Sequence, residues 1–274
     1  MIKSVRRWYR PASVTAALEL LSKKRVKPYA GGTSFQRGGN PDLHAFLDLR
    51  QLPLHEIKEQ ARDIEIGALV RFSDLARYSF PDARAILSLA VSQAASNTLR
   101  NLITIGGSLA DHPAWSNLLA PLLVLEARIK VAGAAQEYYP LPQFLQEKIC
   151  AGTTLITGVH LPPAPGFGAY RRWARTRFDY SVVDVAVYLE CRQNQIQCAR
   201  LALGNLWATA RRIPEIEARL TGRDLRDPEL PELLKLPPVK IAPHPGFSSA
   251  FRLNLTHQLL CAVLQQIREQ SHAN

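Results

Sequence analysis

The sequence predicts an α+β protein of two domains, and three observations carry that prediction. The 274 residues are 47% hydrophobic and 21% charged, which is enough apolar material for an ordinary globular protein with more than one domain. Segments of helical and strand periodicity alternate along the chain. A segment rich in proline and glycine, PPAPGFGAY at residues 162–170, divides these segments into two groups.

The first domain is predicted over residues 1–163, with subdomains of about residues 1–55 and 56–163. Pro11 and Ser13 mark a helix start before VTAALELLSKK, and the short strands VKPYA and AFLDLR follow. The second subdomain is expected to hold a strand at DIEIGAL, helices at RFSDLARYS and DARAILSLAVSQAAS, a helix running into a strand at LLAPLLVLEARIKVAG, and a last strand at TTLITGVHL.

The second domain, residues 164–274, begins in the segment 162–170, which is predicted to be a linker because its prolines and glycines do not suit a regular element. It is predicted to be a smaller α+β unit. Its expected elements are paired strands at DYSVVDVAVYLECR and IQCARLALGNL, a helix at EIEARLTG, an irregular connection at DPELPELLKLPPVKIAPHPG, and a long terminal helix at SAFRLNLTHQLLCAVLQQI.

The composition disfavours membrane and metal proteins. No apolar run approaches the roughly 20 residues that span a bilayer, and the opening MIKSVRRWYRPAS lacks the apolar core of a signal peptide, so a cytoplasmic location is expected. The seven histidines show no short metal-ligand spacing. Four scattered cysteines form no C-x-x-C pair, so any iron–sulfur chemistry must come from another chain; they are Cys150, Cys191, Cys198 and Cys261.

The net charge of +11 admits a nucleic-acid partner, since VRRWYR and YRRWARTR interleave arginine with aromatic residues. The basic residues are nevertheless spread along the chain, without a long run or a nucleic-acid motif. An acidic protein surface or an anionic cofactor would satisfy the same charge. We therefore expect no nucleic acid as a partner.

Two glycine pairs are the strongest functional signal. Gly31 and Gly32 follow a strand pattern in KPYAGGTSFQRGG, residues 27–39. Gly106 and Gly107 follow an apolar, strand-like run in LRNLITIGGSLAD, residues 99–111. Glycine lets backbone N–H groups approach a phosphate closely. With a Ser or Thr beside each pair, the pattern suits a ligand with more than one phosphate, held between loops rather than at a helix N-terminus. The Rossmann and Walker motifs are both absent.

These motifs resemble the FAD-binding subunits of the molybdenum hydroxylases, the xanthine dehydrogenase and carbon monoxide dehydrogenase group. AGGTS at 30–34 looks like the first flavin loop of the family, and LRNLITIGGSLAD looks like the second. The resemblance covers nearly the whole chain. The segments that support it are DIEIGALVRFSDL, ARTRFDYSVVDVAV, RLALGNLWATARRIPEIEARLTG and SSAFRLNLTHQLL.

The resemblance implies a two-subdomain FAD-binding domain of the vanillyl-alcohol-oxidase/PCMH-like type, followed by the smaller α+β domain. It also implies an electron-transfer role without activity on substrate by this chain alone. Electrons would come from substrate at a molybdenum-cofactor subunit, cross the clusters of an iron–sulfur subunit, and reach FAD here. The FAD would pass them to an acceptor such as NAD or oxygen. The chain is thus expected to work in a hetero-oligomer, with no catalytic side chain and no metal of its own.

The resemblance also assigns candidate cofactor contacts. Backbone N–H groups of the first loop would face the pyrophosphate, and the second loop would form the opposing wall. The first-loop residues are Ala30, Gly31, Gly32, Thr33 and Ser34, and the second-loop residues are Gly106, Gly107 and Ser108. Thr104 either fixes its own turn or contacts the cofactor. Arg100 is expected to dock the loop rather than touch the flavin.

Two further contacts are expected nearer the C-terminus. Asp179 matches an acidic position of the family that would bind the ribityl chain or ring edge of FAD, oriented by Arg175 and Arg177; a surface ion pair is the alternative. Asn117 stands where the family usually has Asp, and Ser108 stands where Asn is common. These departures leave open the details of the adenosine and flavin contacts.

Two other classes of function remain open at this stage. One is a flavin-fold scaffold that has lost its cofactor. The other is a basic binding protein whose glycine pairs are ordinary turns. Yellow absorbance of the purified chain separates the first class from a flavoprotein, and nucleic-acid binding with a steep salt dependence would mark the second.

Overall fold

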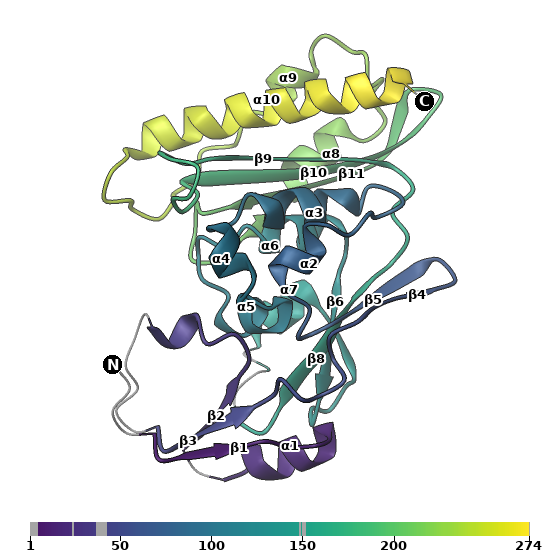
Figure 1. The fold of residues 1–274 in the computed structure, drawn as a ribbon. Coiled ribbons are helices and arrows are strands. Elements are labelled where there is room, and N and C mark those ends of the chain that lie inside the picture. The colour runs from purple at the N-terminus through teal and green to yellow at the C-terminus, as the bar shows by residue number, and fades with distance from the viewer. Residues whose placement is uncertain (1–4, 24, 37–42, 148, 150–151, 274) are drawn as a thin grey trace. The chain divides into compact units, whose positions relative to one another are not determined.

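The computed structural model describes residues 5–23, 25–36, 43–147, 149 and 152–273. The chain forms two compact units. The first unit comprises residues 1–75, 96–111 and 127–162, and the second comprises residues 76–95, 112–126 and 163–274. The first unit contains two sheets and the second contains one, and each unit has its own helices (Figure 1).

The first unit contains a small parallel sheet in the order β1-β3-β2, built from β1 (Arg7–Tyr9), β3 (Ala45–Asp48) and β2 (Val26–Tyr29). Helix α1 (Val14–Leu21) packs on it through Ala17 and Leu21. The predicted start of this helix is confirmed, because Ser13 Oγ accepts a hydrogen bond from the backbone N–H of Ala16 at 3.1 Å. Strands β2 and β3 are confirmed as well.

The first unit also contains an antiparallel sheet in the order β4-β5-β8-β6-β7. Its strands are β4 (Ile57–Gln60), β5 (Asp63–Gly67), β8 (Leu155–Leu161), β6 (Arg128–Ala132) and β7 (Tyr138–Pro140). The predicted strands β5, β6 and β8 form its centre. Short helices complete the unit: α2 (Phe72–Leu75), α4 (Asn97–Arg100), α5 (Ile105–Asp111) and α7 (Leu141–Gln146).

The second unit is built on an antiparallel sheet in the order β12-β11-β10-β9. Its strands are β12 (Arg211–Arg212), β11 (Gln195–Gly204), β10 (Val183–Arg192) and β9 (Phe167–Trp173). The predicted pairing of β10 with β11 is confirmed. Helices lie on both faces, with α10 (Ser249–Ala273), α8 (Pro214–Leu220) and α9 (Leu230–Leu233) on one and α3 (Ala85–Ser92) and α6 (Leu119–Val124) on the other (Figure 1).

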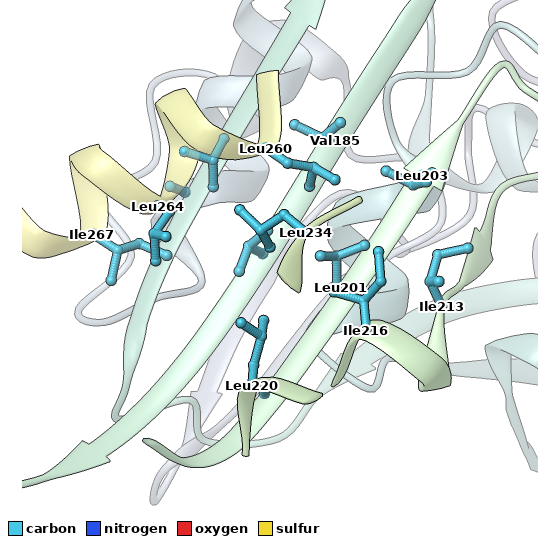
Figure 2. Close-up of a cluster of buried hydrophobic side chains, with 14 of the residues drawn as sticks. Val185, Leu201, Leu203, Ile213, Ile216, Leu220, Leu234, Leu260, Leu264 and Ile267 are labelled. Atoms are coloured by element: carbon cyan, nitrogen blue, oxygen red, sulfur yellow. The ribbon is translucent and has the colours of Figure 1, made fainter. Parts of the chain in front are cut away.

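The core of the second unit lies between the sheet and α8, α9 and α10 (Figure 2). Leu260, Leu264 and Ile267 recur at helical spacing on α10 and meet the alternate side chains of β10 and β11, such as Val185 and Leu201. Full burial of each such side chain contributes about 1.5–3 kcal/mol. This packing explains why the long terminal helix forms where its periodicity predicts it.

The segment predicted to be a linker differs in its second half. Residues 167–170 belong to β9 rather than to a connection. Its glycines serve close packing: a Cβ on Gly168 would lie 2.8 Å from the carbonyl oxygen of Ala83, and one on Gly166 would overlap the carbonyl oxygen of Leu189. Glycine here removes a side chain that would clash, so its presence did not signal irregular structure.

No helix in the described part of the chain is both long enough and apolar enough to cross a membrane. Within those residues, no group of three or more His, Cys, Asp or Glu side chains is placed to hold a metal ion. Cys150 lies outside the described residues.

Candidate functional site

The first glycine pair lies at the carboxyl end of β2, where a parallel sheet commonly presents its ligand-binding loops. Gly32 has φ +72°, in the left-handed region, and a Cβ there would lie 2.6 Å from Tyr29 Oη. A Cβ on Gly31 would overlap the backbone carbonyl oxygen of Leu102. Both positions therefore require glycine, Gly32 for its backbone conformation and Gly31 for its packing against the segment that precedes the second pair.

The backbone N–H groups of the first loop are open. Among the described residues, those of Gly31, Gly32 and Thr33 donate no hydrogen bond. Ala30 packs at the edge of the small apolar cluster under α1, and a short 3-10 turn, η1 (Ser34–Gln36), follows the glycines. Open N–H groups beside glycines are the arrangement that binds an anion.

The second glycine pair is not a loop after a strand, contrary to the sequence prediction. The preceding residues form α4 and a turn, and Gly106 and Gly107 lie in the first turn of α5. The Leu- and Ile-rich run suggested a strand. Instead, Ser96 Oγ caps α4 by accepting from the N–H of Leu99 at 3.3 Å, and Thr104 forms only an isolated bridge with Arg71.

The N–H groups at the start of α5 are already bonded. The N–H of Ile105 donates to the Val70 carbonyl, and that of Gly106 to the Ala68 carbonyl, each at 2.9 Å. The N–H of Gly107 donates to Thr104 Oγ1 at 3.1 Å, and that of Ser108 to the Thr104 carbonyl at 2.9 Å. Of the two roles considered for Thr104, the structure shows the bond to its own turn.

The surroundings of Gly106 and Gly107 differ. Gly106 is buried, and a Cβ on it would lie 2.7 Å from the Cβ of Ala68. A Cβ on Gly107 would meet only Thr104 Oγ1, at 2.9 Å. Little therefore covers the backbone of Gly107. A ligand can pack against the second pair, although the N–H groups of the pair are already bonded. The two glycine segments meet where Gly31 packs on Leu102.

Asn117 lies in the second unit, just before α6, and is 5% exposed. Its Oδ1 accepts a hydrogen bond from Ser181 Oγ at 3.0 Å. Its Nδ2 is buried without any hydrogen-bond partner. A buried amide that donates to nothing is costly, and such a group is commonly completed by a ligand or a water.

Asp179 also lies in the second unit, in the connection between β9 and β10. Its Oδ2 accepts from Arg175 Nε at 2.9 Å, and its Oδ1 accepts from the N–H of Tyr180 at 2.9 Å. The hydrogen bond from Arg175 holds the pKa of the Asp179 carboxyl below its usual value. Asp179 thus forms an ion pair with Arg175, which is the alternative to a cofactor contact that the sequence left open. The Arg177 guanidinium lies over the Phe178 ring, 5.8 Å from its centroid, and the Arg177 carbonyl accepts from Arg172 Nη2 at 2.7 Å.

Sequence reasoning missed two residues that organise this part of the second unit. Arg172 Nη1 lies 3.2 Å from the Asp179 carbonyl oxygen and 3.4 Å from Ser181 Oγ. Through Ser181 the guanidinium is therefore connected to Asn117. The arginine-rich YRRWARTR pointed to this region, but only the register of β9 against β10 shows which arginine turns toward the connection.

The residues fit a dinucleotide cofactor of the FAD type. The first loop offers open N–H groups for a pyrophosphate, and Gly107, in the same unit, offers an uncovered backbone. The sequence pattern of the family described as FAD binding domain in molybdopterin dehydrogenase matches residues 3–164. The pattern described as CO dehydrogenase flavoprotein C-terminal domain matches residues 168–267. The chain therefore belongs to the FAD-binding flavoprotein family of the molybdopterin dehydrogenases.

Individual relatives agree with this family. The chain is 31% identical over 221 residues to the 6-hydroxypseudooxynicotine dehydrogenase complex subunit alpha of Paenarthrobacter nicotinovorans, covering 75% of this chain and 74% of that protein. It is 26% identical over 233 residues to the glyceraldehyde dehydrogenase medium chain of Sulfolobus acidocaldarius, covering 80% and 82%. A chain of quinoline 2-oxidoreductase from Pseudomonas putida 86 has the same fold, with a TM-score of 0.88 over 98% of this chain and 99% of that one, at 22% identity.

Proposed function

We propose that this chain is the FAD-binding electron-transfer subunit of a molybdenum hydroxylase complex. It receives electrons from iron–sulfur clusters of one partner subunit, which obtains them from a molybdenum-cofactor subunit, and delivers them to an acceptor such as NAD or oxygen. The observation that carries the proposal is the first glycine loop, whose open N–H groups and left-handed Gly32 lie inside the region that matches the FAD-binding family.

The chain's own contribution is to bind and orient FAD, which supplies the redox chemistry when bound. The N–H groups of Gly31, Gly32 and Thr33 hold the pyrophosphate, with Ala30 and Ser34 flanking them. Gly107 and Ser108 form the opposing surface, and Thr104 and Gly106 fix its shape. Asn117 and Asp179 are proposed as cofactor contacts on the resemblance to the family alone. We also propose that the FAD-binding domain spans residues 1–163 and that the C-terminal domain spans residues 164–274.

The names of the relatives support a heteromeric assembly. One is a medium chain and another is a subunit of a dehydrogenase complex. A net charge of +11 suits docking to acidic partner surfaces. The substrate is chosen by the molybdenum-cofactor subunit.

The first test is the flavin content of the purified chain. We expect yellow protein that releases its FAD on denaturation, because neither glycine segment offers a His or Cys for covalent attachment. Gly32→Val and Gly107→Val should each abolish FAD binding in folded protein. Gly222→Val is the matched control, since Gly222 has φ +85° with no neighbour within 4 Å of an added Cβ. Colourless wild-type protein that cannot be reconstituted would support a cofactor-free scaffold instead.

The second test concerns electron transfer. Under anaerobic conditions, dithionite should bleach the flavin of the isolated chain and of the co-expressed complex. Candidate substrates should bleach it only in the complex, because the described part of this chain offers no metal-binding group of three ligands. Bleaching of the isolated chain by substrate would show a self-contained flavin oxidoreductase and would refute the electron-transfer role.

A further inference from the structure

We propose that the face of the small parallel sheet that lies opposite α1 is a docking site for an acidic segment of a partner protein, with Trp8 as its anchor. The proposal goes beyond FAD binding and does not depend on it. We name this surface the Trp8 face. Its strand residues are Trp8 on β1, Phe46 and Asp48 on β3, and Lys27 and Tyr29 on β2.

The register of the sheet and the alternation of side chains define its two faces. Trp8, Phe46 and Lys27 are paired in register, so their side chains lie in one row on the same face. Tyr9 and Val26 alternate with them and pack with α1 on the other face. A parallel sheet normally has both faces covered. In the described part of the chain α1 covers one face, whereas on the other face Trp8 is 47% exposed.

Trp8 is held in place by other aromatic rings. Its ring centroid lies 4.9 Å from those of Tyr29 and Phe46, and the Phe35 centroid lies 4.8 Å from that of Phe46. An indole that is already held in place loses little side-chain freedom when a partner covers it. Tryptophan is also among the residues that most often dominate the binding energy of protein interfaces. Trp8 is therefore suited to anchor an apolar side chain of the partner.

The charge around Trp8 selects an acidic partner. Residues 1–55 contain ten Lys or Arg and three Asp or Glu, which is a net charge of +7 out of +11 for the whole chain. Arg10, Lys27 and Arg50 are exposed around the face. Asp48 is buried and accepts from Arg50 at 2.7 and 2.8 Å, so it offers little repulsion to an approaching carboxylate. Complementary charge steers and orients a partner on such a surface.

The size of the Trp8 face indicates a short segment and a transient contact. Its three strands of three or four residues cover about 13 Å by 14 Å, at roughly 3.3 Å per residue and 4.8 Å between strands. The sheet face is thus well below the ~800 Å² that each partner contributes to a stable interface. Charge-steered encounters of proteins are typical of this smaller size.

The burial of the other rings favours a protein over the other anionic partners. Single-stranded nucleic acid stacks successive bases on several exposed rings, and a membrane surface binds several protruding apolar side chains. On the Trp8 face, Phe46 is 5% exposed and Tyr29 is half-buried, which leaves the exposed ring of Trp8 to make the apolar contact. One aromatic anchor among arginines and a lysine is instead the pattern of a protein interface.

The test measures binding of a labelled peptide of glutamates with one central phenylalanine to the full-length chain, by fluorescence anisotropy. Binding should weaken as salt is added. Trp8→Ala should weaken it about 10-fold, because the anchor is lost. Lys27→Glu should weaken it about 3–10-fold. The matched control is Arg7→Glu, which makes the same change of charge on the α1 side of the sheet and should leave the affinity nearly unchanged.

Several results would overturn the proposal. An equal loss of affinity in Lys27→Glu and Arg7→Glu would show attraction to net charge alone. Wild-type affinity in Trp8→Ala would remove the anchor, and urea unfolding checks that each variant is folded. If Trp8→Ala does not fold, the comparison of Lys27→Glu with Arg7→Glu decides. Tighter binding of a thymidine oligonucleotide or of phosphatidylserine vesicles through Trp8 and Lys27 would overturn the assignment to a protein. Absence of peptide binding would overturn the docking site and leave the proposed FAD function intact.

Discussion

Asp184, on β10, is a buried carboxyl whose replacement should stabilise the protein. It is 0% exposed, and its Oδ1 accepts a hydrogen bond from Asn205 Nδ2 at 2.6 Å. Its Oδ2 and the buried hydroxyl of Tyr170 make no hydrogen bond of ordinary geometry. Burial raises the pKa of the Asp184 carboxyl from 3.8 to about 7, although Asn205, the cation of Arg172 directly across the sheet and the nearby Tyr170 hydroxyl act in the opposite direction.

This pKa fixes both the sign and the size of the pH dependence. The folded protein holds the proton more tightly than the unfolded chain, so the stabilising contribution of the neutral acid is fully present below about pH 4. It is lost as the pH rises to about 7. The rise from 3.8 corresponds to about 4 kcal/mol between these limits, at 1.36 kcal/mol per pKa unit.

The perturbation is Asp184→Asn, a neutral side chain of the same shape. At pH 8 we expect it to raise the free energy of unfolding by about 2–4 kcal/mol, because the ionised carboxylate is no longer buried. Near pH 5 the gain should be much smaller. The assay is urea unfolding of FAD-free protein from pH 5 to pH 8. Asp224→Asn is the control, since hydrogen bonds from Arg226 lower the pKa of the exposed Asp224 to about 2.

The decisive comparison is how the free energy of unfolding changes with pH in the wild type and in the two variants. The stability of the wild type should fall with rising pH relative to that of Asp184→Asn, while Asp224→Asn should not gain stability at pH 8. A difference between wild type and Asp184→Asn that does not change with pH would refute the assignment of a neutral buried acid. So would a loss of stability at pH 8.

The remaining predictions concern packing and are measured by urea unfolding. Gly31→Ala should cost about 1–3 kcal/mol and lower the FAD content, because the added Cβ meets the Leu102 backbone; unchanged stability would show that the two glycine segments are not in contact. Glu217→Leu should cost about 2–4 kcal/mol, since it removes the buried carboxylate that accepts from Arg212 at 2.7 and 2.8 Å and from the N–H of Leu201 at 2.8 Å. Ile267→Ala should cost about 2–5 kcal/mol, and a smaller loss would mean that α10 packs less tightly than Figure 2 shows.

The sequence predicted the long elements because their signals are local. Helix α10 and the β10–β11 pair carry many apolar side chains at regular spacing, and their burial reproduces that spacing. Strands β1, β4 and β7 were missed, and each lies at the edge of its sheet. An edge strand of three or four residues, such as IKEQ in β4, is mostly exposed and has little apolar alternation. Its structure comes from a partner strand and not from its own residues.

In the candidate site, too, local sequence patterns predicted some residues and not others. The glycine positions and Asn117 follow from short motifs, so the sequence was sufficient to name them. Ser181 matters through its hydrogen bond to Asn117, a residue more than 50 positions away, and Arg172 through its bond to Ser181, and no local pattern records either contact. The role of Thr104 could not be predicted from the sequence for a different reason. A bond to its own turn and a bond to a ligand use the same hydroxyl, and the sequence is identical in both cases.

The two glycine pairs show how similar motifs acquire different physical roles. Both have a hydroxyl residue beside two glycines, and from the sequence both predicted loops around phosphates. The second pair begins a helix, where the Ala68 and Val70 carbonyls and Thr104 consume the nearest N–H groups. In the first pair the left-handed Gly32 leaves the neighbouring N–H groups open. An anion gains hydrogen bonds only from donors that have no other partner, so we expect the first segment to supply the pyrophosphate contacts of the proposed FAD site and the second segment to contribute its shape.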